Sequence, residues 1–288
     1  MEQDRIRDII SRALEEDIGE GDVTTSAIVA PEAVVSGRFV AKEGGVVAGL
    51  EVADMTFIVV DDQIRFTARV KDGSRTEPGQ VLATVEGPGR RVLAAERVAL
   101  NFLQRMSGIA TMTRVFADAV RGTRAIILDT RKTAPGIRVL DKWAVRLGGG
   151  ENHRMGLYDM VLIKENHITV AGGVAEAVRR VRAMVGAKPL VEVEVKNIGE
   201  FKEALTLNVD RILLDNMSLE ELAEAGRLAG GNVRLEASGN ITLGNVAAVA
   251  AAGIDYISVG SLTHSVRALD ITFLVDPPHN SKNIDTLK

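Results

Sequence analysis

Residues 191–196 read Val-Glu-Val-Glu-Val-Lys, and this stretch decides the fold. Successive side chains of a β-strand point to opposite faces, so the valines share one face while Glu192, Glu194 and Lys196 share the other. Taken alone, the pattern is typical of an edge strand with one solvated face. It is the third of six apolar runs, however, which favours a central strand whose charged face lines the inside of a barrel.

The runs on either side of this stretch alternate with helical segments. The apolar β runs are Ala125–Leu128, Met160–Ile163, Leu190–Val195, Arg211–Leu214, Val233–Glu236 and Tyr256–Val259. The intervening segments with helical spacing or composition are Ala175–Val185, Ile198–Leu205, Leu219–Ala229 and Thr242–Ala252. Such alternation predicts a parallel sheet with crossover helices, and six repeats suit either an incomplete barrel or an open sheet.

Two different patterns precede the alternating region. Residues 1–17 have the spacing of an amphipathic helix, and residues 34–89 contain short β-branched runs separated by glycine turns, as in a small β-rich domain. Residues 91–121 return to helical spacing, with Gly108 as the expected break between two helices that link the domains. From Asp276 onward the composition predicts a poorly ordered tail.

Composition places the chain among ordinary globular proteins, since 46% of its 288 residues are apolar and 26% are charged. The absence of cysteine excludes disulfides, thiolate nucleophiles and cysteine–zinc sites. A charged N-terminal segment and the lack of any apolar stretch of bilayer length predict a cytoplasmic protein. The net charge of -4 gives no general attraction to nucleic acid or membranes, so an anionic ligand must be held by clustered cations.

Polar residues follow every one of the β runs. In parallel α/β folds the ligand binds at the carboxyl ends of the strands, so we expect these residues to converge on one site. They are Asp129–Lys132, Lys164–Asn166, Glu194–Asn197, Asp215–Asn216, Ser238–Asn240 and Gly260–Ser261.

A group of cations accompanies the first two strand ends. Guanidinium and ammonium groups gathered in one place suit a small molecule with several carboxylates or phosphates. Pairing with Asp129, Asp141 or Glu151 would account for some of these cations but not for all of them. The group consists of Arg131, Lys132, His153, Arg154 and Lys164.

Glycine-containing turns, 238–240 and 259–262, follow the last two β runs. Backbone N–H groups at such turns can hold a phosphate. Glycine is common there for steric reasons alone, but the tandem placement favours a phosphate site.

The Gly148–Gly150 segment follows no β run, so we interpret it as a flexible loop that carries His153 and Arg154 into the site. Neither His153 nor His167 has a partner at metal-ligand spacing, which favours ordinary hydrogen-bonding roles for both histidines.

Longer motifs run in order along the chain, from residue 16 to about residue 272. They are Glu16–Thr24, Asn101–Thr111, Asp129–Gly136, Gly149–Arg154, Ile163–His167, Glu192–Val195, Leu214–Asn216, Glu236–Ile241 and Ser258–Gly260. Together they resemble the quinolinate phosphoribosyltransferase family, and their number and order make the resemblance highly specific.

The resemblance implies an N-terminal α/β sandwich domain followed by an incomplete parallel α/β barrel. It places the sandwich and the interdomain helix in residues 1–110, the catalytic barrel in 111–270, and a tail that could return to the N-terminal domain in 271–288. It also implies a homodimer, or a higher oligomer, in which Arg105 of one subunit enters the active site of the other.

The implied activity belongs to NAD biosynthesis. The phosphoribosyl group of phosphoribosyl pyrophosphate is transferred to the ring nitrogen of quinolinate with decarboxylation, giving nicotinate mononucleotide, pyrophosphate and carbon dioxide. Mg²⁺ is the implied cofactor and enters with the pyrophosphorylated substrate.

The resemblance also implies roles for individual residues. Lys132, Glu194 and Asp215 would be catalytic, and Glu194 and Asp215 would hold the ribose hydroxyls and reach Mg²⁺ indirectly through the bound substrate. The remaining residues implied to bind substrate on the quinolinate side are Thr130, Arg131, His153, Arg154 and Lys164. Those implied to bind the 5′-phosphate are Ser238, Gly239, Asn240, Val259, Gly260 and Ser261.

Other kinds of protein fit part of this pattern. A paralogue of the same fold, such as the pyrophosphorylase-like protein associated with molybdate transport, would act on another anionic heterocycle. A ligand-binding or scaffold protein would not need acidic and basic residues at all the strand ends. A lipoyl-type carrier module in residues 71–87 is disfavoured, because no lysine lies at an obvious hairpin tip.

Overall fold

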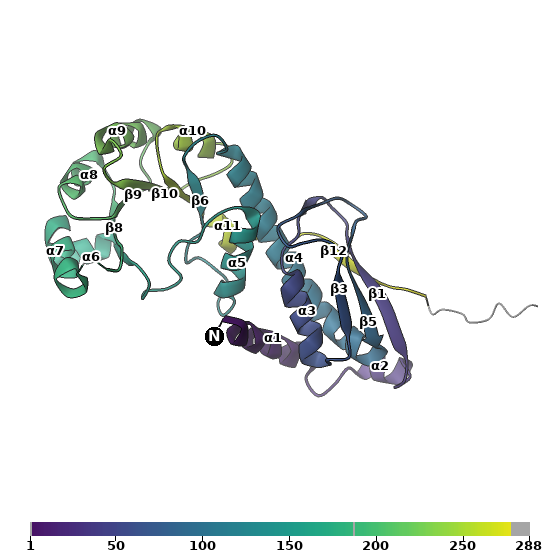
Figure 1. Ribbon diagram of the computed structural model, residues 1–288. Coiled ribbons are helices and arrows are strands. Elements are labelled where there is room, and N and C mark those ends of the chain that lie inside the picture. The colour runs from purple at the N-terminus through teal and green to yellow at the C-terminus, as the bar shows by residue number, and fades with distance from the viewer. Residues whose placement is uncertain (1, 187, 278–288) are drawn as a thin grey trace, which may run out of the picture. The chain divides into compact units, whose positions relative to one another are not determined.

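The structure is a computed structural model, and it describes residues 2–186 and 188–277. These residues form two compact units (Figure 1). The first unit contains the described residues up to Gly108 and those from Arg267 onward, and the second contains Ile109–Val266. The predicted α/β architecture with two domains is confirmed.

The first unit is built around a four-stranded antiparallel sheet in the order β12-β1-β5-β3. Its strands are β1 (Val34–Ala41), β3 (Arg65–Ala68), β5 (Val81–Pro88) and β12 (Ile271–Val275), while β2 (Gly45–Val46) and β4 (Arg75–Thr76) form a separate pair. Its helices are α1 (Glu2–Ile18), α2 (Val23–Ile28), α3 (Leu50–Val60) and the first part of α4 (Gly89–Ala119).

Aromatic side chains from the sheet and from α3 form the centre of this unit. Phe39 of β1 and Phe57 of α3 are fully buried, and their ring centroids lie 6.0 Å apart. The ring centroids of Phe273, on β12, and Phe39 lie 4.9 Å apart, so strand β12 contributes to the core of the first unit. The predicted poor order from Asp276 concerns mainly residues 278–288, which lie outside the described residues.

Helix α4 is continuous, so the predicted break at Gly108 is wrong. A Cβ atom at Gly108 would lie 2.1 Å from the carbonyl oxygen of Arg267 and 3.0 Å from the Cα of Ala268. The returning backbone therefore packs directly against the helix. Glycine, a poor helix former, is required here because it has no side chain rather than because it ends the helix.

The second unit contains a six-stranded parallel sheet in the order β6-β11-β10-β9-β8-β7. Its strands are β6 (Ile126–Leu128), β7 (Val161–Ile163), β8 (Val191–Val195), β9 (Arg211–Asp215), β10 (Arg234–Ser238) and β11 (Tyr256–Ser258). The sheet curves like the wall of a barrel (Figure 1). Within the described ranges no strand pairing joins β6 to β7, so the barrel is incomplete.

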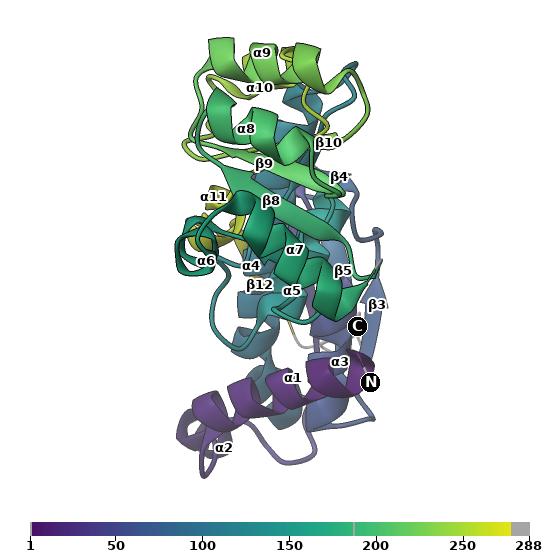
Figure 2. The ribbon, with the colours of Figure 1, turned by 90° about the vertical axis from the view of Figure 1, so that its left-hand side faces the viewer.

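Helices cover the outer face of this curved sheet (Figure 1 and Figure 2). The second unit begins with the last part of α4, and its other helices are α5 (Arg138–Gly148), α6 (Glu165–Ala171), α7 (Val174–Val185), α8 (Ile198–Leu205), α9 (Leu219–Ala229), α10 (Val246–Ala251) and α11 (Ser261–His264). Helix α9 begins at a capping box, in which Ser218 accepts from the Glu221 N–H while the Glu221 side chain binds the Ser218 N–H. Its buried face, Leu222, Ala225 and Ala229, points toward the sheet.

Strand β8 confirms the interpretation of the Val-Glu-Val-Glu-Val stretch as a central strand. It pairs with β7 on one side and with β9 on the other, which excludes a solvated edge strand. Both faces are enclosed: Val191, Val193 and Val195 are fully buried, and so is Glu192 on the opposite face. No helix among the described residues is long and apolar enough to cross a membrane.

We expect Gly108→Ala to destabilise the protein, although alanine is the better helix former. Helix propensity alone would raise the free energy of unfolding by about 1 kcal/mol, whereas overpacking against a fixed backbone costs about 1–3 kcal/mol. Urea denaturation followed by circular dichroism measures the sign. An increase in stability would show that the Arg267 backbone does not lie against α4.

Candidate active site

A cavity of about 650 Å³ opens at the carboxyl ends of the strands in the second unit. All residues with a predicted binding or catalytic role line it except Arg105 and Val259. Among the other strand-end residues that were expected to converge there, Asp129, Glu165, Asn166, Lys196 and Asn197 do not line it. The lining residues are Thr130, Arg131, Lys132, His153, Arg154, Leu162, Lys164, Glu194, Leu213, Asp215, Asn216, Glu236, Ser238, Gly239, Asn240, Ile241, Ser258, Gly260, Ser261 and His264.

Arg105 and Val259 lie elsewhere. Arg105 is on α4 in the first unit and is partly exposed, so its role across a dimer interface stays a prediction. Val259 is buried, and its backbone N–H donates to the Leu128 carbonyl at 2.9 Å. That N–H is used inside the sheet, whereas Gly260 and Ser261 beside it do line the cavity.

The cations of the cavity are largely free of protein carboxylates. Lys164 is paired, since its Nζ lies 3.0 Å from Glu194 Oε2. Within the described ranges no carboxylate forms an ion pair with Arg131, Lys132 or Arg154. Burial and the charge of Arg131 lower the pKa of Arg154, although its guanidinium stays charged at physiological pH. This wall of the cavity therefore carries positive charges that no ion pair within the described ranges neutralises.

Two of the three carboxylates that were considered as partners of these cations, Asp129 and Asp141, are used elsewhere. Asp129 is fully buried and pairs with the equally buried Lys142. Asp141 accepts the backbone N–H of Ala134 at 3.1 Å. The structure thus leaves the positive charge available to an anionic ligand.

The glycine turn after β10 is held by asparagine side chains. Gly239 and Asn216 have φ values of +94° and 55°, and Asn240 has 51°, so three residues adopt left-handed backbone. The Asn240 side-chain amide donates to Asn216 Oδ1 at 3.0 Å. A Cβ atom at Gly239 would lie 2.1 Å from the same oxygen, so only glycine allows the two turns to meet. Neighbouring turns of this kind present backbone N–H groups suited to phosphate.

The segment that follows the glycines is bound to the sheet. Glu151 forms an isolated bridge with Leu128, and its N–H donates to the Ile127 carbonyl at 2.9 Å. The segment carries His153 and Arg154 to the cavity as predicted, but the prediction of a flexible loop is wrong: Gly148 ends α5, and the Gly150 N–H donates to the Val145 carbonyl at 3.1 Å.

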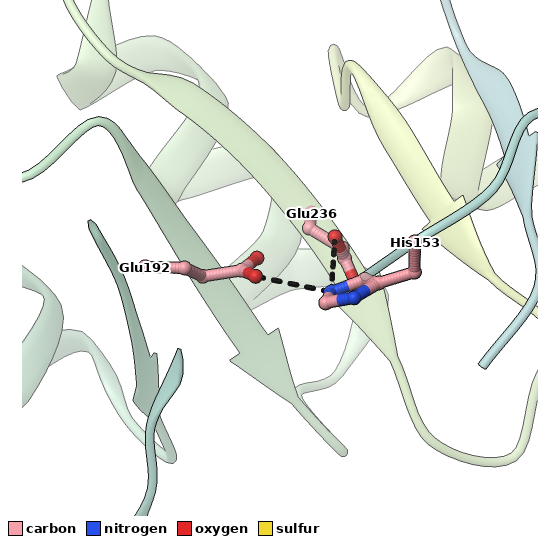
Figure 3. A group of neighbouring side chains, drawn as sticks. All are labelled: His153, Glu192 and Glu236. Carbon is pink, nitrogen blue, oxygen red and sulfur yellow. Dashed lines mark hydrogen bonds and ion pairs between the residues drawn. The ribbon is translucent and has the colours of Figure 1, made fainter. Parts of the chain in front are cut away.

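The His153 side chain contacts two fully buried carboxyl groups, those of Glu192 and Glu236 (Figure 3). Its Nε2 lies 3.1 Å from Glu192 Oε2 and 3.5 Å from Glu236 Oε2. Arg211 Nη1 lies 2.8 Å from Glu236 Oε2, and the Ser258 hydroxyl donates to Glu236 Oε1 at 2.6 Å. We call His153, Glu192, Glu236 and Arg211 the lumen network.

These burials perturb the acid–base properties of the network. Burial raises the pKa of Glu192 to about 7, opposed mainly by the charge of Arg211. Burial and the charge of Glu192 raise the pKa of Glu236 to about 7. Burial lowers the pKa of His153 in spite of the nearby Glu236, so the imidazole is neutral near neutral pH.

Some cavity residues were not predicted from the sequence as binding residues. They are Leu162, Leu213, Asn216, Glu236, Ile241, Ser258 and His264. Asn216 belongs to the strand-end residues that were expected to converge on the site, although no binding role was assigned to it. Ser258 lies inside a recognised motif and within the predicted β run Tyr256–Val259. Glu236 is the last residue of the predicted β run Val233–Glu236 and the first of the motif Glu236–Ile241, and no binding role was assigned to it.

The carboxyl pair predicts how stability depends on pH. Each group has a folded-state pKa of about 7, above its ordinary 4.5, so the stability it contributes is complete below 4.5 and is lost as pH rises through about 7. We expect the free energy of unfolding to fall over this window by up to about 1.4 kcal/mol per pH unit for each proton released. Denaturation by urea across the window measures the slope.

Glu236→Gln should make this pH dependence shallower, because one of the two carboxyl groups no longer ionises. Asp61→Asn, at a partly exposed position after α3, provides the control and should leave the slope unchanged. An identical slope in wild type and Glu236→Gln would contradict the assignment.

Together these features define an α/β-barrel protein with a cationic cavity and a phosphate-type turn at its strand ends. Models of the quinolinate phosphoribosyl transferase family match both units, the N-terminal domain over residues 22–107 and the C-terminal domain over residues 109–274. The chain belongs to this family.

Individual relatives agree with the family models. The chain is 47% identical over 279 residues to the nicotinate-nucleotide pyrophosphorylase [carboxylating] of Mycobacterium leprae, covering 94% of this chain and 97% of the relative. It is 45% identical over 290 residues to quinolinate phosphoribosyltransferase [decarboxylating] 1b of Nicotiana tabacum, covering 94% and 82%. The crystal structure of NadC from Streptococcus pyogenes superposes with a TM-score of 0.90 at 42% identity, covering 93% and 95%.

Proposed function

We propose that this chain transfers the phosphoribosyl group of phosphoribosyl pyrophosphate to the ring nitrogen of quinolinate and releases carbon dioxide. The observation that carries the proposal is the single cavity in which unpaired cations, two partly buried carboxylates and a glycine turn meet. Relatives that cover most of the chain are named for this activity.

The cationic wall suits the two carboxylates of quinolinate. Arg131, Lys132 and Arg154 would bind them, with Thr130 beside Lys132 and Lys164 adjacent. The Thr130 hydroxyl accepts the Lys132 N–H at 3.0 Å, and the Thr263 hydroxyl donates to the Lys132 carbonyl at 2.9 Å. The backbone of Lys132 is thus held at both its N–H and its carbonyl, and its side chain lines the cavity.

The carboxylate side of the cavity suits the ribose. Glu194 and Asp215 would accept hydrogen bonds from its hydroxyls and stabilise positive charge that develops on the ring when the bond to pyrophosphate breaks. The 5′-phosphate would bind the turns at Ser238, Gly239, Asn240, Gly260 and Ser261.

The same carboxylates fit a divalent ion that enters with the substrate. Carboxylate oxygens are suitable partners for Mg²⁺, directly or through water and substrate oxygens, and the Asn216 amide donates to Asp215 Oδ2 at 3.0 Å. Glu194 and Asp215 would act on the ion through the bound substrate. When bound, the ion would neutralise charge on the departing pyrophosphate.

The reaction then balances in two steps. The lone pair of the quinolinate nitrogen forms a bond to the anomeric carbon, and the bond from that carbon to pyrophosphate oxygen breaks with its electrons. The quaternised nitrogen stabilises the electron pair left on the adjacent ring carbon when its carboxylate departs as carbon dioxide. That carbon then takes a proton from water, which gives nicotinate mononucleotide.

We expect the protein to release carbon dioxide from carboxyl-labelled quinolinate only with phosphoribosyl pyrophosphate and Mg²⁺ present. Lys132→Ala and Arg154→Ala should each lower kcat/KM for quinolinate by about 100-fold, because each removes a charge that binds the substrate in a partly water-excluded site. Scintillation counting of the released carbon dioxide measures both.

Arg227→Ala, an exposed position on α9, is the matched control and should behave like wild type. Turnover of another anionic heterocycle with none of quinolinate would indicate a same-fold paralogue. Binding without turnover would indicate a non-enzymatic protein.

We also propose a homodimer in which Arg105 completes the partner's site. Arg105→Ala and Lys164→Ala should each be inactive, and random mixing should restore about a quarter of wild-type activity, since half of the dimers are hybrids with one intact site. Refolding an equimolar mixture and measuring carbon dioxide release tests this. Confirmed hybrids without activity would exclude a shared site.

A cytoplasmic location for this protein stays a prediction.

A further inference from the structure

We propose that Glu192 and Glu236 are positioning residues, which hold the His153 imidazole in one tautomer and through it fix Arg154 in the cavity wall. The inference rests on the proposed function for its kinetic part only. Within the lumen network both carboxyl groups contact His153 Nε2, and no predicted role in binding or catalysis uses either of them.

The tautomer follows from the two ring nitrogens. The backbone N–H of Arg154 donates to His153 Nδ1 at 2.7 Å, so Nδ1 must carry the lone pair. A neutral imidazole then carries its proton on Nε2, and this N–H points at Glu192 Oε2 at 3.1 Å, with Glu236 beside it (Figure 3). Both nitrogens are therefore bound within the protein and are not available as an acid or base toward substrate.

The backbone of His153 is held as firmly as its ring. Its N–H donates to Asp129 Oδ1 at 2.9 Å, and its carbonyl accepts from Lys142 Nζ at 2.9 Å. Asn152 donates to Asp129 Oδ2 at 2.6 Å. Every polar atom of His153 thus has a partner, which leaves the adjacent Arg154 little freedom to move.

The same tautomer argues against a metal ion at this place. Atoms of His153, Glu192 and Glu236 lie within 4.8 Å of one another, a spacing that could hold an ion. A metal would need the lone pair of Nε2, which carries the proton. Arg211 Nη1 already lies 2.8 Å from Glu236, and its guanidinium stacks 3.9 Å from the Tyr256 ring centroid. The Arg211 guanidinium thus already supplies the positive charge beside Glu236 that a metal ion would otherwise provide.

One atom of the network lacks a hydrogen bond in the described part of the chain. Glu192 Oε1 is buried without a hydrogen-bonding partner, and the nearest guanidinium nitrogen, Arg211 Nε, is 4.0 Å away. Burying a carboxyl group so incompletely satisfied is unfavourable for stability. Its other oxygen, Oε2, lies 3.1 Å from the imidazole Nε2, and this contact is the one that serves the site.

The test compares two substitutions of Glu192. Glu192→Gln keeps an oxygen that can accept the Nε2 proton, whereas Glu192→Leu has a similar size and removes the acceptor. We expect Glu192→Leu to raise the KM for quinolinate about tenfold or more with a smaller change in the KM for phosphoribosyl pyrophosphate. Glu192→Gln should restore most of the affinity.

The tautomeric state of the His153 imidazole is measured by two-dimensional ¹H–¹⁵N NMR of protein labelled with ¹⁵N-histidine. The His153→Asn variant serves to assign the signal. We expect the neutral Nε2–H tautomer in wild type and in Glu192→Gln, and a mixture of tautomers in Glu192→Leu. This readout needs no activity, so it remains decisive if the protein does not turn over quinolinate.

Asp255→Asn is the matched control, because Asp255 is a buried, ion-paired carboxylate of the same unit that does not line the cavity. It should lower the melting temperature without changing the KM or the His153 signal. A wild-type Nδ1–H tautomer or imidazolium would overturn the proposal. So would a Glu192→Leu protein with unchanged KM for quinolinate, or a Glu192→Gln protein as defective as Glu192→Leu. If Glu192→Leu does not fold, the wild-type tautomer and the KM of Glu192→Gln decide.

Discussion

The carboxyl groups of Glu192 and Glu236 can lie buried on the inner face of the parallel sheet because the Arg211 guanidinium and the neutral His153 imidazole contact them. Glu192, Arg211 and Glu236 come from the adjacent strands β8, β9 and β10, and the register pairs Glu192 directly with Arg211. A slip of one residue in any of these strands would turn a charge outward and bury an unpaired one. The register that places Arg211 between these carboxyl groups also sets the carboxyl ends of the strands, where the cavity opens.

Much of the site could be predicted from the sequence because parallel strands impose a simple geometry. Residues that follow β runs converge whatever their separation along the chain, and the structure brings Lys132, Lys164, Glu194 and Asp215 to one cavity. The period of two in residues 191–195 separated valines from glutamates correctly. Distinguishing Glu192 from Glu194 was harder, because both share one face and only depth in the sheet makes one buried and the other accessible to ligand.

Other features depend on contacts that local sequence does not record. Gly108 reads as a helix break, yet the approach of a backbone segment far along the chain explains it. The use of the Val259 N–H inside the sheet depends on β6 lying next to β11. The proposed role of Arg105 depends on a second subunit, so only the family resemblance could suggest it.

Strand β12 has a consequence for how the chain is made. It completes a sheet whose other strands end at residue 88, while the whole second unit lies between residues 109 and 266. On the ribosome, the barrel therefore emerges entirely before the edge of β1 receives its last partner. The nascent chain departs from the usual N-to-C-terminal order of domain folding, because its N-terminal unit is the last to be completed. Until then an unpaired strand edge is exposed to other chains, a surface that chaperones commonly protect.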